Sequence, residues 1–183
     1  MSDPPPLGSN VLVVESEPTA ALRYAFDRFD ETEGPTVVVN AAPRTESVLA
    51  AAGEAWAAEA NHVVDCSGET ADATALDATV TVGGSDVPSV GEATVRALDD
   101  ATAPVGLCLD SVSAVVERSS IQQAYKLLYL VAERVRSLDA RAFYTWSGPI
   151  EERTRRILTR PLDDVVRLGA GERRATEAGD GER

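Results

Sequence analysis

The sequence predicts an α/β fold in which helices cover both faces of a mainly parallel β-sheet, a three-layer αβα sandwich. Two observations predict it. Short runs of β-branched residues alternate with amphipathic stretches, which is the pattern of parallel strands joined by helices. These runs are also apolar throughout, as expected of strands buried on both faces. With 183 residues, of which 44% are hydrophobic, the chain can bury one sizeable core, so one domain is expected.

Strands and helices are expected to alternate along the chain. In order, we predict a strand at 11–14, a helix at 18–29, a strand at 36–39, a helix near 46–60, a strand at 62–66, a weaker strand at 78–82, a helix at 89–99, a strand at 105–109, a helix at 120–138, a strand at 141–146, a helix at 150–159 and a strand at 165–168. Each strand is a short apolar run, and each helix has apolar residues spaced three or four apart. Ser16 and Pro88 favour the starts of the two helices that follow them.

The helix from Ser120 to Leu138 has the clearest pattern. Its apolar stripe lies opposite polar residues, and the stripe is wider than contact with one sheet requires, because Leu127 and Leu130 extend it. This width predicts a second contact for the helix, such as a homodimer interface.

Both ends of the chain are predicted to lie outside the core. Residues 1–9 form a proline-rich, polar lead that we expect to be flexible. Residues 169–183 are rich in Gly, Glu and Arg with almost nothing apolar to bury, which predicts a disordered acidic and polar tail. The folded domain is therefore expected at 10–168.

The net charge of −13 limits the partners of this chain, because it repels nucleic-acid phosphates and anionic lipid head groups. Neither nucleic acid nor membrane is an expected partner. No run approaches the roughly 18 apolar residues of a membrane span. Only Lys126 among the 17 basic residues is a lysine, and the surface composition resembles that of haloarchaeal cytoplasmic proteins. This resemblance implies a cytoplasmic protein whose acidity reflects concentrated salt.

The cysteines and the histidine do not predict a catalytic or metal site. Cys66 and Cys108 each lie in a strand-like run without CxxC spacing, so we expect two buried thiols. The one histidine, His62, begins a predicted strand, and the sequence has no GxSxG elbow. A nucleophile paired with a base is therefore not expected.

Ligands of a parallel sheet bind beyond the carboxyl ends of its strands, so the residues that follow each strand are the candidates for a site. They are Glu15, Ser16, Glu17, Pro18 and Thr19 after the first strand, Asn40 after the second, Asp110 and Ser111 after the fourth, and Trp146 and Ser147 after the fifth.

Several of these segments resemble the RecA/KaiC/RadA class of ATPases over nearly the whole chain. The resemblance is carried by Gly8 to Asn10 leading into the first strand, by Val105 to Ser111, and by the strand that begins at Asp164. It implies a RecA-like sheet in which Asp110 matches the Walker B aspartate that helps to position magnesium. Asn40 stands near the position of the glutamate that activates water, and an amide cannot accept that proton.

The phosphate loop is where the sequence departs from this class. The motif GxxxxGK[ST], which supplies a backbone cradle and a lysine for phosphates, is absent after the first strand. Glu15 and Glu17 stand there instead and oppose a triphosphate by charge. The sequence therefore predicts a pseudo-ATPase without a cofactor or metal, which acts as a regulatory or scaffolding module on a protein partner.

Other interpretations of the same residues stay open at this stage. The chain could bind ATP and magnesium through Asp110, arginines and an unconventional loop. Asp110 could instead cap a turn or pair with an arginine, which is the role we favour, and Trp146 could form a recognition surface or seal the sheet edge. The segment from Val11 to Pro18 also resembles the start of a response-regulator receiver. A receiver needs a phosphorylated aspartate, for which Asp65 is the candidate, and a lysine that this chain lacks after the fifth strand.

Overall fold

Seven parallel strands and one short antiparallel strand form one sheet in the computed structural model, which describes residues 5–16, 19–29, 34–42, 62–68, 79–102, 105–169 and 172–173. The strands are β1 (Asn10–Glu15), β2 (Thr36–Asn40), β3 (His62–Asp65), β4 (Thr79–Val82), β5 (Gly106–Asp110), β6 (Arg141–Ser147), β7 (Asp164–Gly169) and β8 (Glu172–Arg173). Their order across the sheet is β4-β3-β2-β5-β6-β1-β7-β8, and β8 is antiparallel to β7.

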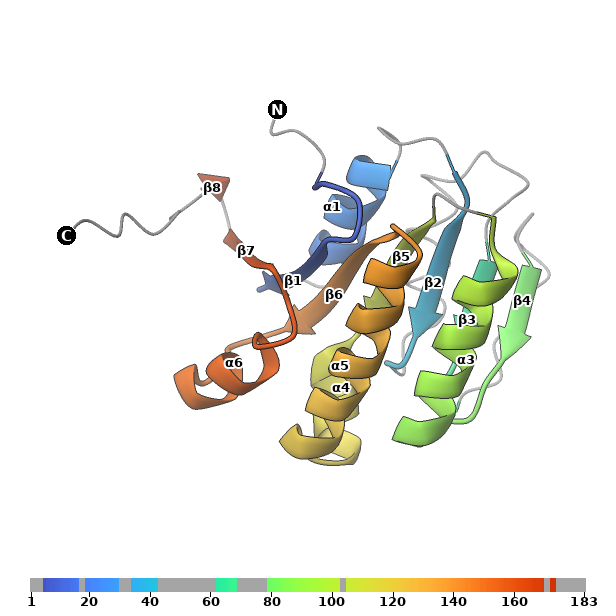
Figure 1. The fold of residues 1–183 in the computed structure, drawn as a ribbon. Coiled ribbons are helices and arrows are strands. Elements are labelled where there is room, and N and C mark those ends of the chain that lie inside the picture. The colour runs from blue at the N-terminus through green and yellow to red at the C-terminus, as the bar shows by residue number, and fades with distance from the viewer. Residues whose placement is uncertain are drawn as a thin grey trace.

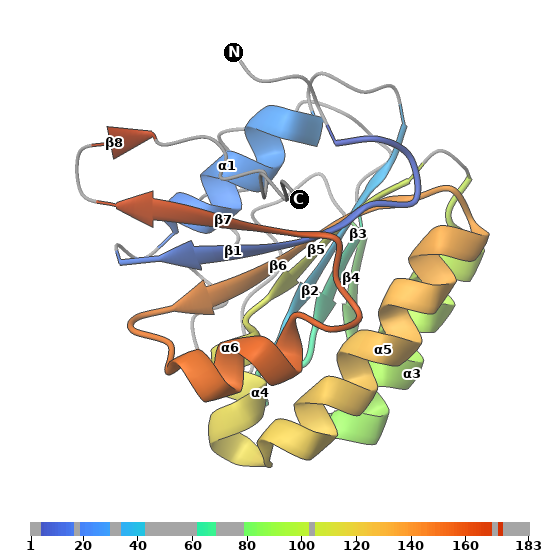
Figure 2. The same ribbon diagram turned by 60° about the vertical axis from the view of Figure 1, so that its left-hand side comes forward.

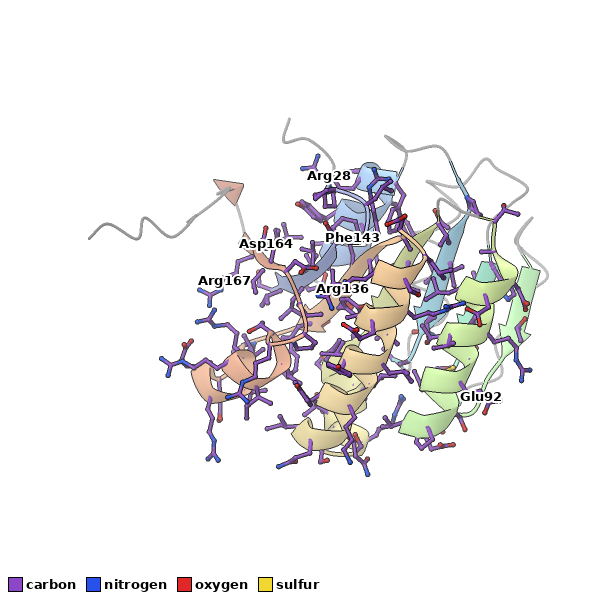
Figure 3. The ribbon with its side chains drawn as sticks, viewed as in Figure 1. Arg28, Glu92, Arg136, Phe143, Asp164 and Arg167 are labelled. Carbon is purple, nitrogen blue, oxygen red and sulfur yellow. The ribbon has the colours of Figure 1, made fainter. Side chains whose placement is uncertain are left out.

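Helices lie on both faces of this sheet (Figures 1 and 2). The described helices are α1 (Ala20–Phe29), α3 (Val87–Asp100), α4 (Val112–Arg118), α5 (Ile121–Ser137) and α6 (Glu152–Leu158). α1 covers one face, where Phe143 of β6 contacts the rings of Tyr24 and Phe29 with centroids 5.8 and 5.2 Å apart (Figure 3). α3, α4, α5 and α6 contribute to the apolar cluster on the other face. The predicted three-layer αβα sandwich is therefore confirmed.

The strand assignments follow the apolar runs of the sequence closely. Every predicted strand is present, with ends that differ by at most one residue. α3 begins two residues earlier than predicted, because Asp86 caps it by accepting the backbone N–H of Ser89 at 3.0 Å. The helix predicted near 46–60 lies outside the described residues. No helix in the described part of the chain is long and apolar enough to cross a membrane.

One helix was not predicted. α4 follows β5 directly and is capped by Ser111, whose Oγ accepts the backbone N–H of Ala114 at 3.3 Å. With seven residues, α4 is too short to give a clear helical period, and its valines favour a strand assignment equally well. β8 was not predicted either, and it lies within the segment for which we predicted a tail.

The position of β1 in the sheet bears on the receiver alternative. β1 lies between β6 and β7, with Val11 opposite both Phe143 and Asp164. Receivers have the strand order 2-1-3-4-5, in which the first strand neighbours the second. β2 pairs instead with β3 and β5. The observed order therefore does not support a receiver.

The predicted burial of the two thiols is confirmed. Cys66 and Cys108 are both fully buried. Burial, together with the neighbouring Asp65 carboxylate, raises the pKa of the Cys66 thiol to about 11. The thiolate form that reacts with electrophiles is therefore scarce at Cys66 near neutral pH.

Candidate functional site

Five neighbouring strands each have a polar residue at the carboxyl end, so five polar side chains lie along the same edge of the sheet. They are Glu15 on β1, Asn40 on β2, Asp65 on β3, Asp110 on β5 and Ser147 on β6. The strand register places Asn40 beside both Asp65 and Asp110, and Glu15 beside Ser147. Four of the five side chains are buried, and Asn40 and Asp110 have no exposed surface. This edge is the place where a parallel α/β sheet binds ligands.

Glu15 joins β1 to the start of α1. One carboxylate oxygen, Oε2, accepts the backbone N–H of Ala21 at 2.7 Å, and the other, Oε1, accepts the Ser147 hydroxyl at 2.8 Å. Ala21 lies in the first turn of α1, whose N–H groups have no partner within the helix. Glu15 is only 2% exposed, so its charge is stabilised by these donors and by the helix dipole rather than by water.

The hydrogen-bonded chain continues from Ser147 to the start of α4. The backbone N–H of Ser147 donates to Ser113 Oγ at 3.3 Å, and the hydroxyls of Ser113 and Ser111 lie 3.0 Å apart. Glu15, Ser147 and Ser111, which were candidates from the sequence, are thereby linked through Ser113. Ser113 was not a candidate, because α4 itself was not predicted.

Asp110 and Asn40 have separate partners. The Thr145 hydroxyl donates to Asp110 Oδ1 at 2.5 Å, and the Asp110 carbonyl accepts the backbone N–H of Ala41. The Asp110–Ser111 peptide bond is cis. Asn40 Oδ1 accepts the backbone N–H of Ala42 at 3.2 Å. The Asp110 side chain therefore ties the end of β5 to β6, whereas the Asn40 carbonyl oxygen holds the turn that follows β2.

Asp65, the residue that a receiver would phosphorylate, is also held by the chain. Its Oδ1 accepts the backbone N–H of Ser67 at 3.0 Å and lies 3.5 Å from Asn40 Nδ2. Asp65 is only 3% exposed. The Asp65 carboxylate thus accepts a hydrogen bond within the turn that follows β3.

The remaining candidates near the first strand differ in position. Ser16 is exposed, and Thr19 adopts a left-handed backbone conformation with φ of 71°. Glu17 and Pro18 lie outside the described residues. Trp146 belongs to the core, and its Nε1 is 3.4 Å from the Pro149 carbonyl. Trp146 therefore seals this part of the sheet.

The two leucines proposed for an interface also differ. Leu127 is 4% exposed and packs against α3 at Gly91, where an added Cβ would lie 3.2 Å from Leu127 Cδ1. Leu130 is 51% exposed. The contact between α3 and α5 therefore accounts for Leu127, whereas most of Leu130 faces solvent.

The described residues include no metal site, and the cavity that lies beside β4 is smaller than a typical ligand site. They contain no group of three or more His, Cys, Asp or Glu side chains that could hold a metal ion. A cavity of about 240 Å³ lies between β3, β4 and α3, and His62, Arg96 and Asp100 contribute to its lining. Its volume is below the roughly 300–1,000 Å³ of drug-sized ligand sites. In the strand order, β2, β5 and β6 separate β3 from β1 and Glu15.

Comparison with known proteins assigns the family. Residues 8–168 match the model of a family of unknown function, DUF7504. The chain belongs to this family. A comparison with curated proteins gave no match. Among solved structures, this DUF7504 chain is similar to the KaiC-like protein PH0186 from the hyperthermophilic archaeon Pyrococcus horikoshii OT3, with a TM-score of 0.60 and 14% identity over 89% of this chain and 72% of that chain.

This structural likeness shows the fold of the DUF7504 chain, which is RecA/KaiC-like. The segment between β1 and α1 then corresponds to the phosphate loop of that fold, where a nucleotide lies against the N-terminus of the first helix. Here Ala21, in the first turn of α1, donates its backbone N–H to a carboxylate of the chain itself, that of Glu15. This backbone donor is therefore already engaged at the start of α1.

Proposed function

We propose that this chain is a non-catalytic RecA/KaiC-like domain that works as a regulatory or scaffolding module through contacts with other proteins. One observation carries the proposal: Glu15 Oε2 accepts the Ala21 backbone N–H at 2.7 Å, so a carboxylate occupies the start of α1. A nucleotide phosphate would need the same N–H groups.

The electrostatics of this position support the proposal. A triphosphate would have to displace Glu15 from Ala21 and Ser147, or bind beside it. Like charges at about 4 Å repel by roughly 1–4 kcal/mol in water-rich surroundings. The sequence lacks the loop glycines and the lysine that offset phosphate charge in an active P-loop. Charge and chemistry therefore both oppose nucleotide at this site.

The surroundings of Asp110 point in the same direction. Asp110 is 0% exposed and accepts the Thr145 hydroxyl, so its carboxylate fastens β5 to β6. A magnesium ion would require this carboxylate to turn toward solvent. We infer that Asp110 has a structural role in this chain.

Titration of the full chain with a fluorescent ATP analogue and magnesium, in dilute and in concentrated potassium chloride, tests the proposal. We expect no saturable signal and no phosphate release. The variant Asp110→Asn should behave like the parent chain in this titration. Micromolar affinity with turnover, lost in Asp110→Asn, would show an active ATPase and overturn the proposal.

A further inference from the structure

The outer side of α5 is the starting observation. In Figure 1, α5 lies in front of the sheet beside α3, and no described element covers its outer side. Tyr129 and Leu130 are 52% and 51% exposed at the middle of this side. The exposed residues of α5 form what we call the α5 face: Gln122, Gln123, Lys126, Tyr129, Leu130, Glu133 and Ser137.

The apolar centre of the α5 face is held in place by its neighbours. A Cβ added to Gly91 of α3 would lie 3.6 Å from Leu130 Cδ2, so the edge of this side chain already rests on α3. The rings of Tyr125 and Tyr129 lie with centroids 6.4 Å apart. Side chains fixed in this way lose little rotamer freedom when a partner covers them.

The α5 face of one copy is complementary in charge to the α5 face of a second copy that runs antiparallel to it. The point midway between Tyr129 and Leu130 divides it into two halves of matching character. One helical turn before this point stands Lys126, and one turn after it stands Glu133. Two turns out, the polar residues Gln122 and Ser137 end the face. Two copies aligned antiparallel about this point therefore bring opposite charges together on both sides of an apolar centre.

We propose that a second copy of this chain docks on the α5 face, with the two α5 helices antiparallel about a two-fold axis that passes between Tyr129 and Leu130. Tyr129 of each copy packs on Leu130 of the other, and Lys126 of each copy faces Glu133 of the other. This arrangement is an isologous interface, in which the same surface is used twice. This inference rests on the proposed role as a protein-interaction module, and it identifies a second copy of the chain as the partner.

Charge supports a second copy as the occupant. The chain carries −13 overall, so most approaches of two copies are repulsive. The α5 face carries one positive and one negative residue, and Lys126 is the single lysine of the sequence. Glu133 accepts Arg136 of its own helix at 2.9 Å, yet its side chain stays 55% exposed. The α5 face is thus a neutral region where two acidic molecules can meet.

The size of the interface sets the expected affinity. With 17 residues, α5 is roughly 25 Å long, from a rise of about 1.5 Å per residue. One helix pair of this length buries less than the roughly 1,200–2,000 Å² of a stable interface. We therefore expect a reversible dimer with a dissociation constant in the micromolar range.

Sedimentation equilibrium of the full chain over a wide concentration range tests this inference. The parent chain should change from monomer to dimer. Lys126→Glu alone, or Glu133→Lys alone, should raise the dissociation constant about tenfold or more, because two like-charge contacts replace two favourable ones. The double variant should recover most of the parent affinity. Arg153→Glu on the exposed side of α6 changes the net charge as Lys126→Glu does and should dimerise like the parent.

Cross-linking gives a second readout. Both natural cysteines are buried, so Leu130→Cys introduces one accessible thiol close to the two-fold axis. A short bis-maleimide should join two copies of this variant, whereas Arg153→Cys should stay uncoupled. A parent chain that is monomeric at every concentration, or a double variant no tighter than the single ones, would overturn the inference. Neither result would bear on the nucleotide titration, so failure of the dimer is distinguishable from failure of the proposed function.

Discussion

Substitution of Glu15 tests the structural role of the carboxylate at the start of α1. In Glu15→Ala, the Ala21 N–H and the Ser147 hydroxyl lose their acceptor in a region where Glu15 was only 2% exposed. Glu15→Gln keeps the side-chain volume and one carbonyl oxygen for Ala21. Ser16→Ala, at the exposed neighbouring residue, is the matched control.

The expected magnitude follows from the two hydrogen bonds. Hydrogen bonds to charged groups contribute about 1.5–3 kcal/mol each. Relief of the cost of burying the carboxylate offsets part of this sum, so we expect Glu15→Ala to lower the free energy of unfolding by about 2–4 kcal/mol. At about 2–4 °C per kcal/mol for a domain of this size, the melting temperature should fall by about 4–16 °C. Glu15→Gln should cost about 1 kcal/mol, and Ser16→Ala within about 0.5 kcal/mol of zero.

Urea unfolding followed by circular dichroism measures these differences. A double-mutant cycle with Ser147→Ala isolates the bond between the two side chains, which should show a coupling of about 1 kcal/mol or more. The reasoning is refuted if Glu15→Ala unfolds at the same urea concentration as Ser16→Ala. In that case the carboxylate would not hold α1, and its presence would no longer argue against a phosphate there.

Three further predictions concern the core and the titrating groups. Gly106→Ala should lower the free energy of unfolding by about 1–3 kcal/mol, because the new Cβ would lie 2.6 Å from the Phe29 ring. Neither Cys66 nor Cys108 should react with Ellman's reagent in the native protein at pH 8, and both should react in denaturant, because both are buried. Burial lowers the pKa of His62 below its unfolded value of 6.5, so the unfolded chain takes up its proton first and stability should fall as the pH drops below about 6.5. A His62→Gln variant should lose this part of the pH dependence of the melting temperature.

Each of these predictions has a control. Gly169→Ala meets no atom within 4 Å and should leave stability nearly unchanged. Rapid labelling of one thiol in the native protein would contradict the buried position of both cysteines. For His62, an unaltered slope between pH 7 and pH 6 in His62→Gln would show that another group titrates in that range.

The strands and the longer helices could be predicted from the sequence for a physical reason. A strand buried on both faces needs an unbroken apolar run, and Val11 to Val14 supplies one that no amphipathic helix would have. α5 is long enough to show several helical periods, and Ser120 caps it by accepting the Gln123 backbone N–H at 3.2 Å. Local sequence therefore determined these elements.

The candidate site could be predicted in part. Charge at Glu15 was visible in the sequence, and so was its place before a helix. Its partner Ser147 follows 132 residues later, and the pair exists only because β1 lies beside β6 in a register that sets these two residues opposite each other. That register depends on tertiary packing, which local periodicity does not report. Leu127 and Leu130 illustrate the same limit, since both approach Gly91 of α3 in the folded chain, yet Leu127 is buried and Leu130 is half exposed.

The place of β1 in the middle of the sheet also has a consequence for synthesis on the ribosome. β1 is made before the other described strands, and both of its neighbours, β6 and β7, come from the last third of the sequence. At about 5–20 residues per second, the 132 residues between Glu15 and Ser147 take roughly 7–26 s to add. During that time Val11, Leu12 and Val13 lack the two strands that flank them in the folded sheet, so the native surroundings of β1 can form only after β6 and β7 have been made.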